Sequence, residues 1–125
     1  MAMILIVDDS KTSRKLLKNL LEENGHEVVG EAGDGMQGVN AYKELNPEIV
    51  TMDITMPVLN GIEALDLIKL HDKDAKVVMV TAAGQQMKMM EALKKGAVDF
   101  VQKPFEPEKI ISIIDKVAKQ WEILS

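Results

Sequence analysis

The stretch MILIVDD at residues 3–9 places an apolar run of strand length directly before two aspartates. Four more short apolar runs, rich in β-branched residues, recur at residues 28–32, 49–52, 77–80 and 100–101. Near-continuous apolar character is typical of strands that are buried on both faces of a parallel sheet. The five runs therefore predict five parallel strands.

Segments with apolar residues at helical spacing lie between and after these runs. Ser10 and Asn60 are predicted to cap two of the helices, Asn24-Gly25 to end the first, and Pro107 to open the last. Strand and helix then alternate five times. This alternation predicts an open, doubly wound α/β fold, in which right-handed crossovers place helices on both faces of the sheet.

Length and composition restrict the class of protein. A chain of 125 residues fits one domain, residues 1–125, and 46% hydrophobic with 28% charged residues is ordinary for a globular protein. No apolar run approaches the roughly 20 residues that cross a bilayer, and no secretory signal is visible. The net charge of −5 argues against direct binding to nucleic acid. We therefore expect a cytoplasmic protein without membrane or nucleic-acid contacts.

Polar residues follow the predicted strands at their carboxyl ends. Asp8 and Asp9 follow the first strand, Asp53 the third and Thr81 the fourth, and Lys103 lies near the end of the fifth. In an open parallel sheet these ends meet at one edge, where ligands bind. Three carboxylates close together repel one another unless a hard cation lies among them. We therefore expect Mg²⁺, which binds one or two carboxylates and retains open positions for phosphoryl oxygens.

The same residues are suited to phosphoryl transfer. An ionised Asp53 is already nucleophilic and can form an aspartyl phosphate without a general base. Lys103 and the metal would neutralise charge on the transferring group, and Thr81 would donate a hydrogen bond to it. The expected product is a chain that carries a phosphoryl group on Asp53.

Four motifs resemble those of the receiver family of response regulators, and most closely its single-domain chemotaxis members of the CheY type. They are ILIVDDS at residues 4–10, MDITMP at 52–57 with Asn60-Gly61 after it, TAA at 81–83 and KPF at 103–105. The resemblance covers nearly the whole chain. It implies the flavodoxin-like strand order 2-1-3-4-5, for which CheY is itself a reference example.

The resemblance also implies roles for individual residues. Asp53 would be the phosphoacceptor, Asp9, Asp53 and the Thr55 backbone carbonyl would bind Mg²⁺, and Asp8 would act largely through water. Thr81 and Lys103 would hold the phosphoryl oxygens, and the Lys103-Pro104 bond would be cis. The family often has a switch tyrosine where this chain has Phe100, which lacks the hydroxyl.

The implied function is that of a signalling protein and not of a classical enzyme, although such a protein assists its own phosphorylation and dephosphorylation. A histidine kinase would supply the phosphoryl group to a monomer. The switch, made by Thr81 and Phe100, would change the face formed by the fourth helix, fifth strand and fifth helix. The expected partners of that face are an output protein such as a flagellar switch component and a phosphatase.

Other functions remain open at this point. Within the family, the chain would fit a phosphorelay intermediate or a receiver excised from a larger regulator. A phosphatase of the haloacid-dehalogenase type would need a general acid two positions after the nucleophile, where this chain has Thr55. A flavin-binding module would need a phosphate loop after the first strand, where this chain has aspartates. His26 and His71 are predicted to be surface histidines without a metal role.

Overall fold

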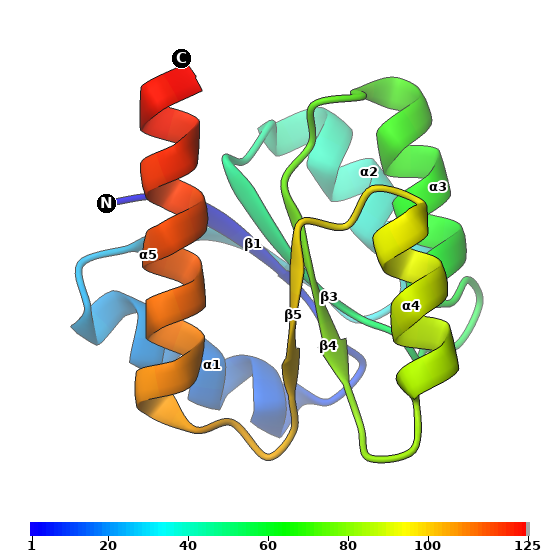
Figure 1. Cartoon of the computed structure of the whole chain (residues 1–125), viewed down its shortest axis with the longest axis horizontal. Helices are drawn as coiled ribbons and strands as arrows, with labels where there is room; N and C mark the ends of the chain where they lie inside the picture. Colours follow the sequence, from blue (N-terminus) through cyan, green and yellow to red (C-terminus); the bar gives the residue numbers. More distant parts are fainter. Residues whose placement is uncertain (125) are drawn as a thin grey trace.

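Five parallel strands form one sheet in the order β2-β1-β3-β4-β5 in the computed structural model, which describes residues 1–124 and the side chains of residues 1–120 (Figure 1). This order confirms the prediction. The strands are β1 (Met3–Val7), β2 (Glu27–Ala32), β3 (Ile49–Asp53), β4 (Val77–Thr81) and β5 (Asp99–Gln102). Each contains the apolar run from which it was predicted.

Helices cover both faces of this sheet. They are α1 (Lys11–Glu23), α2 (Gly35–Leu45), α3 (Gly61–His71), α4 (Gln86–Lys94) and α5 (Pro107–Leu124). Helices α1 and α5 lie on one face, and α2, α3 and α4 lie on the other (Figure 1). The core is correspondingly divided into two hydrophobic clusters, because successive residues of a strand point to opposite faces. In β3, for example, Ile49 belongs to the α1/α5 cluster and Val50 to the other.

The predicted helix ends are confirmed in detail. Ser10 caps α1 and accepts a hydrogen bond from the Ser13 amide, and Asn60 forms a reciprocal capping box with Glu63 at the start of α3. Helix α1 ends at Asn24-Gly25, where Gly25 has a φ of 86° that suits glycine, and α5 begins at Pro107. Asp34 also caps α2, a cap that the sequence patterns did not reveal.

Strand β1 marks the point where the strand order reverses. From β1 the chain first adds β2 on one side and then β3 on the other, so the helices that follow β1 and β3 lie on opposite faces of the sheet. In sheets of this kind, ligands bind at the carboxyl ends of the strands where the order reverses. Asp8 directly follows β1, and Asp53 is the last residue of β3. The topology alone therefore brings these two carboxylates together.

The prediction for His26 was wrong. This residue is only 6% exposed, and it connects the N-terminus to α5. Its Nδ1 accepts a hydrogen bond of 3.1 Å from the Ala2 amide, and its Nε2 lies 2.8 Å from Asp115 Oδ1. The N–H of Ala2 is buried just before β1, so the imidazole provides a partner for a group that water cannot reach. His71, by contrast, is exposed as predicted.

The described residues include no helix that is both long and apolar enough to span a membrane.

Candidate functional site

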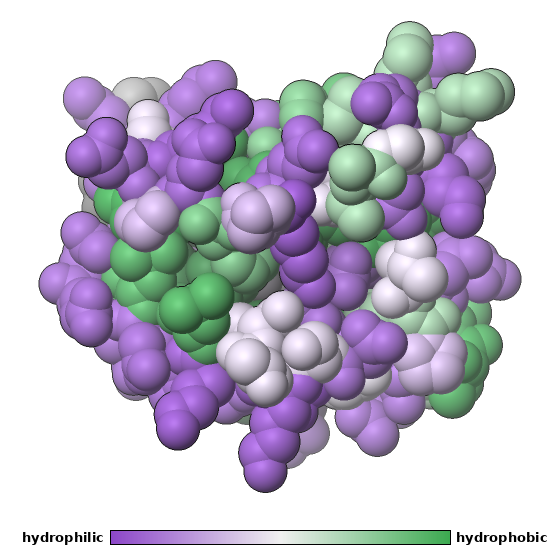
Figure 2. All heavy atoms as spheres, turned by 90° about the horizontal axis from the view of Figure 1, so that it is seen from below, coloured by the Kyte–Doolittle hydropathy of each residue, from purple (hydrophilic) through white to green (hydrophobic). Residues whose placement is uncertain are grey.

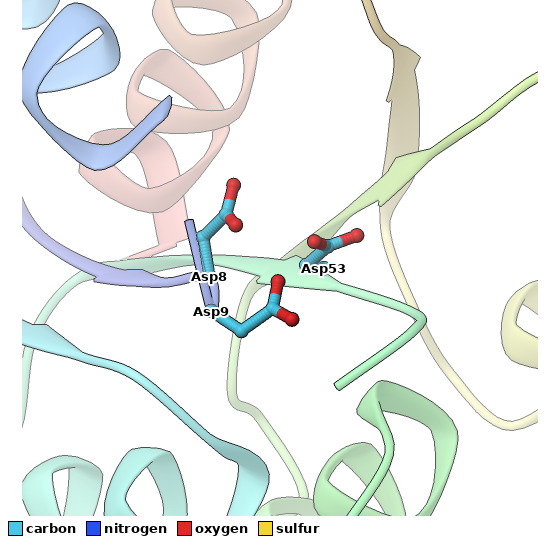
Figure 3. Close-up of side chains that lie close together, drawn as sticks. All are labelled: Asp8, Asp9 and Asp53. Carbon is cyan, nitrogen blue, oxygen red and sulfur yellow. The ribbon is translucent and has the colours of Figure 1, made fainter. Parts of the chain in front are cut away.

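Three carboxylates meet at the carboxyl ends of β1 and β3 (Figure 3). Asp8, Asp9 and Asp53 each place one carboxylate oxygen within 4.8 Å of the others. Asp8 and Asp53 are buried, with exposures of 3% and 8%, whereas Asp9 is exposed. The cluster is therefore a mostly buried site that opens to solvent on the side of Asp9.

A single lysine reaches this cluster from the segment after β5. The Nζ of Lys103 lies 2.8 Å from Asp8 Oδ2 and 3.3 Å from Asp53 Oδ2. Its backbone amide donates to the Thr81 carbonyl at 2.8 Å, which fixes the segment against β4. The Lys103-Pro104 peptide bond that follows is cis, as the family resemblance implied. Lys103 thus bridges two of the three carboxylates.

The charges of the site are unbalanced. Burial raises the pKa of Asp53 to about 6, and the neighbouring Asp8 carboxylate acts in the same direction, while Lys103 partly opposes both. Burial acts to lower the pKa of Lys103, but its hydrogen bonds and charge interactions with Asp8 and Asp53 outweigh this effect, so its pKa is raised. Ionised, the three carboxylates and one ammonium group leave two negative charges uncompensated.

A divalent cation fits this excess of charge. Carboxylate oxygens are the ligands that Mg²⁺ prefers, and the three aspartates offer three of them within a small volume. The backbone carbonyl of Thr55, two residues after Asp53, is the fourth predicted ligand, and it belongs to the loop that leaves β3. Lys103 provides only one positive charge and is already shared between two carboxylates.

The loop between β3 and α3 is held close to Asp53. The Ile54 amide donates to the Val80 carbonyl at 3.2 Å, and the Gly61 amide donates to the Ile54 carbonyl at 2.8 Å. A Cβ atom at Gly61 would overlap the backbone carbonyl of Asp53, so only glycine permits this approach. The start of α3 therefore supports the backbone of the acidic cluster.

The two predicted switch residues lie on neighbouring strands. Thr81 ends β4, is 4% exposed, and donates through its hydroxyl to the Val101 carbonyl at 3.3 Å. Phe100 is half-buried on β5, and it packs against the cluster under α2, α3 and α4. In this arrangement the Thr81 hydroxyl is directed toward β5.

Two residues near the site were not predicted. Arg14 on α1 donates to the Asp8 carbonyl at 2.6 Å and pairs with Glu31 at 3.2 Å, so it holds the end of β1. Gln85 joins the loops that follow β3 and β4 through its side-chain amide. Neither set of contacts leaves a local pattern in the sequence. Arg14 and Glu31 are 17 residues apart, and Gln85 and Thr55 are 30 residues apart.

Hydrophilic residues cover much of the face on which the β4–α4 and β5–α5 loops lie (Figure 2). Hydrophobic residues gather on the left of this view, on the side of α1 and α5. A groove between these two helices is lined by Leu20, Pro107 and Ile111 among others. The site is thus flanked by surfaces of different character.

Residues 4–115 match the response regulator receiver domain family. The chain belongs to this family. The match includes every residue of the acidic cluster, together with Thr81 and Lys103, and it bears out the resemblance seen in the four motifs.

Individual receivers agree with the family assignment. The chain is 48% identical to the chemotaxis protein CheY of Thermotoga maritima, over 93% of this chain and 97% of that protein. It is 38% identical to a chain in the crystal structure of the CheX–CheY–BeF3–Mg²⁺ complex from Borrelia burgdorferi, with a TM-score of 0.87 over 92% of this chain and 87% of that one. A receiver domain protein from Clostridium thermocellum matches over the full length of both chains, with 29% identity and a TM-score of 0.93.

The chain is therefore a receiver of the chemotaxis response regulator type, and it adopts the flavodoxin-like fold of the family.

Proposed function

We propose that this receiver takes a phosphoryl group from a histidine kinase onto Asp53 and signals through the change of shape that follows. The observation that carries the proposal is the position of Asp53, which ends β3 within 4.8 Å of two further carboxylates and 3.3 Å from Lys103 Nζ. Burial and the neighbouring Asp8 carboxylate raise the pKa of Asp53 to about 6, while Lys103 opposes them, so this carboxylate shares its site with both an acidic and a basic neighbour.

The transfer requires few groups because an ionised carboxylate is already a nucleophile. An Asp53 oxygen forms a bond to phosphorus while the bond from phosphorus to the imidazole nitrogen of the kinase phosphohistidine breaks. The nitrogen keeps the electron pair and takes up a proton from water. Lys103 is placed to bind an oxygen of the transferring group, which would draw it away from Asp8. Asp9, Asp53 and the Thr55 carbonyl would hold Mg²⁺, with Asp8 acting through water, and the metal would supply charge neutralisation.

The proposed signal begins at Thr81. A phosphoryl oxygen would attract the Thr81 hydroxyl away from the Val101 carbonyl and move the β4–α4 loop inward. Space under Phe100 would then open, and its ring would become more buried. Beryllofluoride with Mg²⁺, a mimic of the phosphoryl group, should therefore shift amide NMR signals across residues 81–105. Shifts confined to the neighbours of the three aspartates would contradict this step.

The face formed by α4, β5 and α5 is the proposed output surface. It carries exposed lysines and two exposed methionines, 87% and 56% exposed, which suit an acidic partner segment with apolar side chains. The lysines are Lys88, Lys94, Lys95, Lys109, Lys116 and Lys119, the exposed methionines are Met87 and Met90, and Met89 on the same helix is partly exposed. Relatives named as chemotaxis proteins support a flagellar switch component as the output partner.

A phosphatase is the third proposed partner. The Borrelia burgdorferi complex, in which CheX is bound together with CheY, BeF3 and Mg²⁺, supports a second protein that acts on this type of receiver. We further propose that the chain works as a one-domain monomer. The haloacid-dehalogenase alternative lacks support, because Thr55 stands where the general acid would be and a hydroxyl is a poor proton donor at neutral pH.

Acetyl phosphate, a small phosphodonor, tests the proposal directly. With Mg²⁺, wild-type protein should gain one phosphoryl group by intact-mass spectrometry, and Asp53→Asn should gain none. Omission of Mg²⁺ is the matched control and should reduce the labelled fraction strongly. Normal labelling of Asp53→Asn would remove the proposal.

A further inference from the structure

Gln85 connects the two loops that leave the site. Its Oε1 accepts a hydrogen bond of 2.7 Å from the Ala82 amide, and its Nε2 donates one of 2.7 Å to Thr55 Oγ1. Thr55 lies two residues after Asp53, and Ala82 directly follows Thr81. One carboxamide therefore joins the β3–α3 loop to the β4–α4 loop.

This side chain does not serve the helix on which it is placed. Gln85 occupies the N-cap position of α4, yet its side chain makes no capping hydrogen bond to that helix. Instead it closes the turn at residues 82–85 from one side, while the Gln85 amide donates to the Ala82 carbonyl at 3.3 Å from the other. Gly84, with a φ of 88°, completes the turn. The loop is thus held in one defined arrangement.

The contact is positioned to oppose inward movement of the β4–α4 loop. Asp53 pairs with Val80 in the sheet, so the residues that follow Val80 lie beside the acidic cluster. The Ala82 amide, which is a possible donor to an acceptor group on Asp53, is already engaged by Gln85. A movement that turns the Ala82 amide toward an acceptor on Asp53 would break its bond to Gln85, and a movement of Gln85 with the loop would disturb its bond to Thr55.

Helix α4 buries little apolar surface, which makes the hydrogen bonds of Gln85 at its start more important for its position. Ala92 is the buried residue of α4, and most other residues of the helix are exposed. A helix with so little buried apolar surface is held weakly by hydrophobic packing. Its position therefore depends more than usual on the hydrogen bonds at its first turn.

We propose that Gln85 is a positioning residue, which holds the β4–α4 loop in the unphosphorylated arrangement and must release Ala82 or Thr55 when a phosphoryl group is bound. The inference rests on the proposed phosphorylation of Asp53. It adds a restraint on the switch that this chain carries in its own sequence. Removing the Gln85 side chain should favour the arrangement that the loop adopts when a phosphoryl group is bound, without altering any residue of the acidic cluster.

Beryllofluoride binding at saturating Mg²⁺ tests the inference on the full chain, with calorimetry as the measurement. Gln85→Ala should bind beryllofluoride about five-fold more tightly than wild type, because the loss of a typical hydrogen bond changes an equilibrium by about that factor. Thr55→Val should change the affinity in the same direction. The double variant should bind no more tightly than Gln85→Ala alone, since both substitutions remove the same link.

Two further variants separate this role from a merely structural one. Gln85→Glu keeps an acceptor for the Ala82 amide and a second oxygen that can accept from the Thr55 hydroxyl, so it should not bind beryllofluoride more tightly than wild type. Gln86→Ala, a change at the exposed neighbouring glutamine, should match wild type. A Gln85→Ala protein whose affinity equals or falls below that of wild type would overturn the inference. Strictly additive effects in the double variant would overturn it as well.

The same titration distinguishes failure of the inference from failure of the proposed function. If wild-type protein binds no beryllofluoride, the phosphorylation of Asp53 is contradicted, and the role of Gln85 falls with it. If wild type binds but Gln85→Ala shows no gain, only the role of Gln85 is contradicted.

Discussion

Asp53→Asn should stabilise the metal-free protein. The substitution keeps the shape of the side chain and removes a negative charge from a site that holds three carboxylates and one lysine. Burial and the neighbouring Asp8 raise the pKa of Asp53 from 3.8 to about 6, so ionised Asp53 opposes folding at neutral pH. The amide cannot ionise and should avoid this cost.

The magnitude follows from the pKa. Each tenfold change in a protonation equilibrium corresponds to about 1.4 kcal/mol, so a change from 3.8 to about 6 corresponds to about 3 kcal/mol at pH 7. The Asp53 side chain is 11% exposed, and the site opens to solvent beside Asp9, which screens part of the repulsion. We therefore expect Asp53→Asn to raise the free energy of unfolding by about 2 kcal/mol in the presence of a chelator.

The upward shift in the pKa of Asp53 determines how the stability difference depends on pH. A raised folded-state pKa favours folding while Asp53 is protonated, and this contribution is fully present below pH 3.8 and lost as the pH rises through about 6. The advantage of Asp53→Asn should therefore be small near pH 4 and complete above about pH 6. Saturating Mg²⁺ should reduce the advantage, because the metal stabilises the ionised wild-type cluster.

Urea denaturation followed by circular dichroism provides the assay, with Glu44→Gln, a change at an exposed acidic residue of α2, as the matched control. The control should change the free energy of unfolding by less than about 0.5 kcal/mol. If Asp53→Asn were no more stable than wild type at pH 7 in chelator, the account of the site as a strained acidic cluster would be refuted.

Two predictions concern the opposite end of the sheet. Tyr42→Phe removes the 2.7 Å hydrogen bond from the buried Tyr42 hydroxyl to Asp72, and it should lower the free energy of unfolding by about 1 kcal/mol in urea titrations at pH 7. This bond is the main reason that the pKa of Asp72 is lowered, so the deficit should shrink as the pH falls through that lowered pKa, and a constant deficit down to pH 2 would contradict the assignment. His26→Ala leaves the buried Ala2 amide without its partner and should cost about 1–3 kcal/mol by the same measurement; a cost below about 0.5 kcal/mol would show that the amide does not need the imidazole.

The sheet and the acidic cluster could be predicted from the sequence because local patterns determine them. Apolar runs identify the strands, and the connections of a doubly wound sheet bring their carboxyl ends to one edge. Asp8 and Asp53 therefore become neighbours as soon as the strand order is known. The strand order itself came from the family resemblance, since alternation of strands and helices is compatible with several orders.

Contacts that depend on how helices are placed over the sheet could not be predicted. His26 is buried because α5 brings Asp115 to within 2.8 Å of it, and the two residues are 89 positions apart. Gln85 reaches Thr55 only because the β3–α3 and β4–α4 loops run side by side. A polar residue near a helix terminus has the same local appearance in the sequence whether it caps that helix or bridges two loops.

We propose that Asp53 alone carries the phosphoryl group, and chemical mapping of the modified residue would identify the acceptor. Wild-type protein treated with acetyl phosphate and Mg²⁺ would be reduced with borohydride, which converts an aspartyl phosphate to homoserine, and then digested for peptide mass spectrometry. We expect homoserine at position 53 and unmodified aspartate at positions 8 and 9. Homoserine at position 8 or 9, or unmodified aspartate at position 53 in protein that has gained the phosphoryl mass, would contradict it.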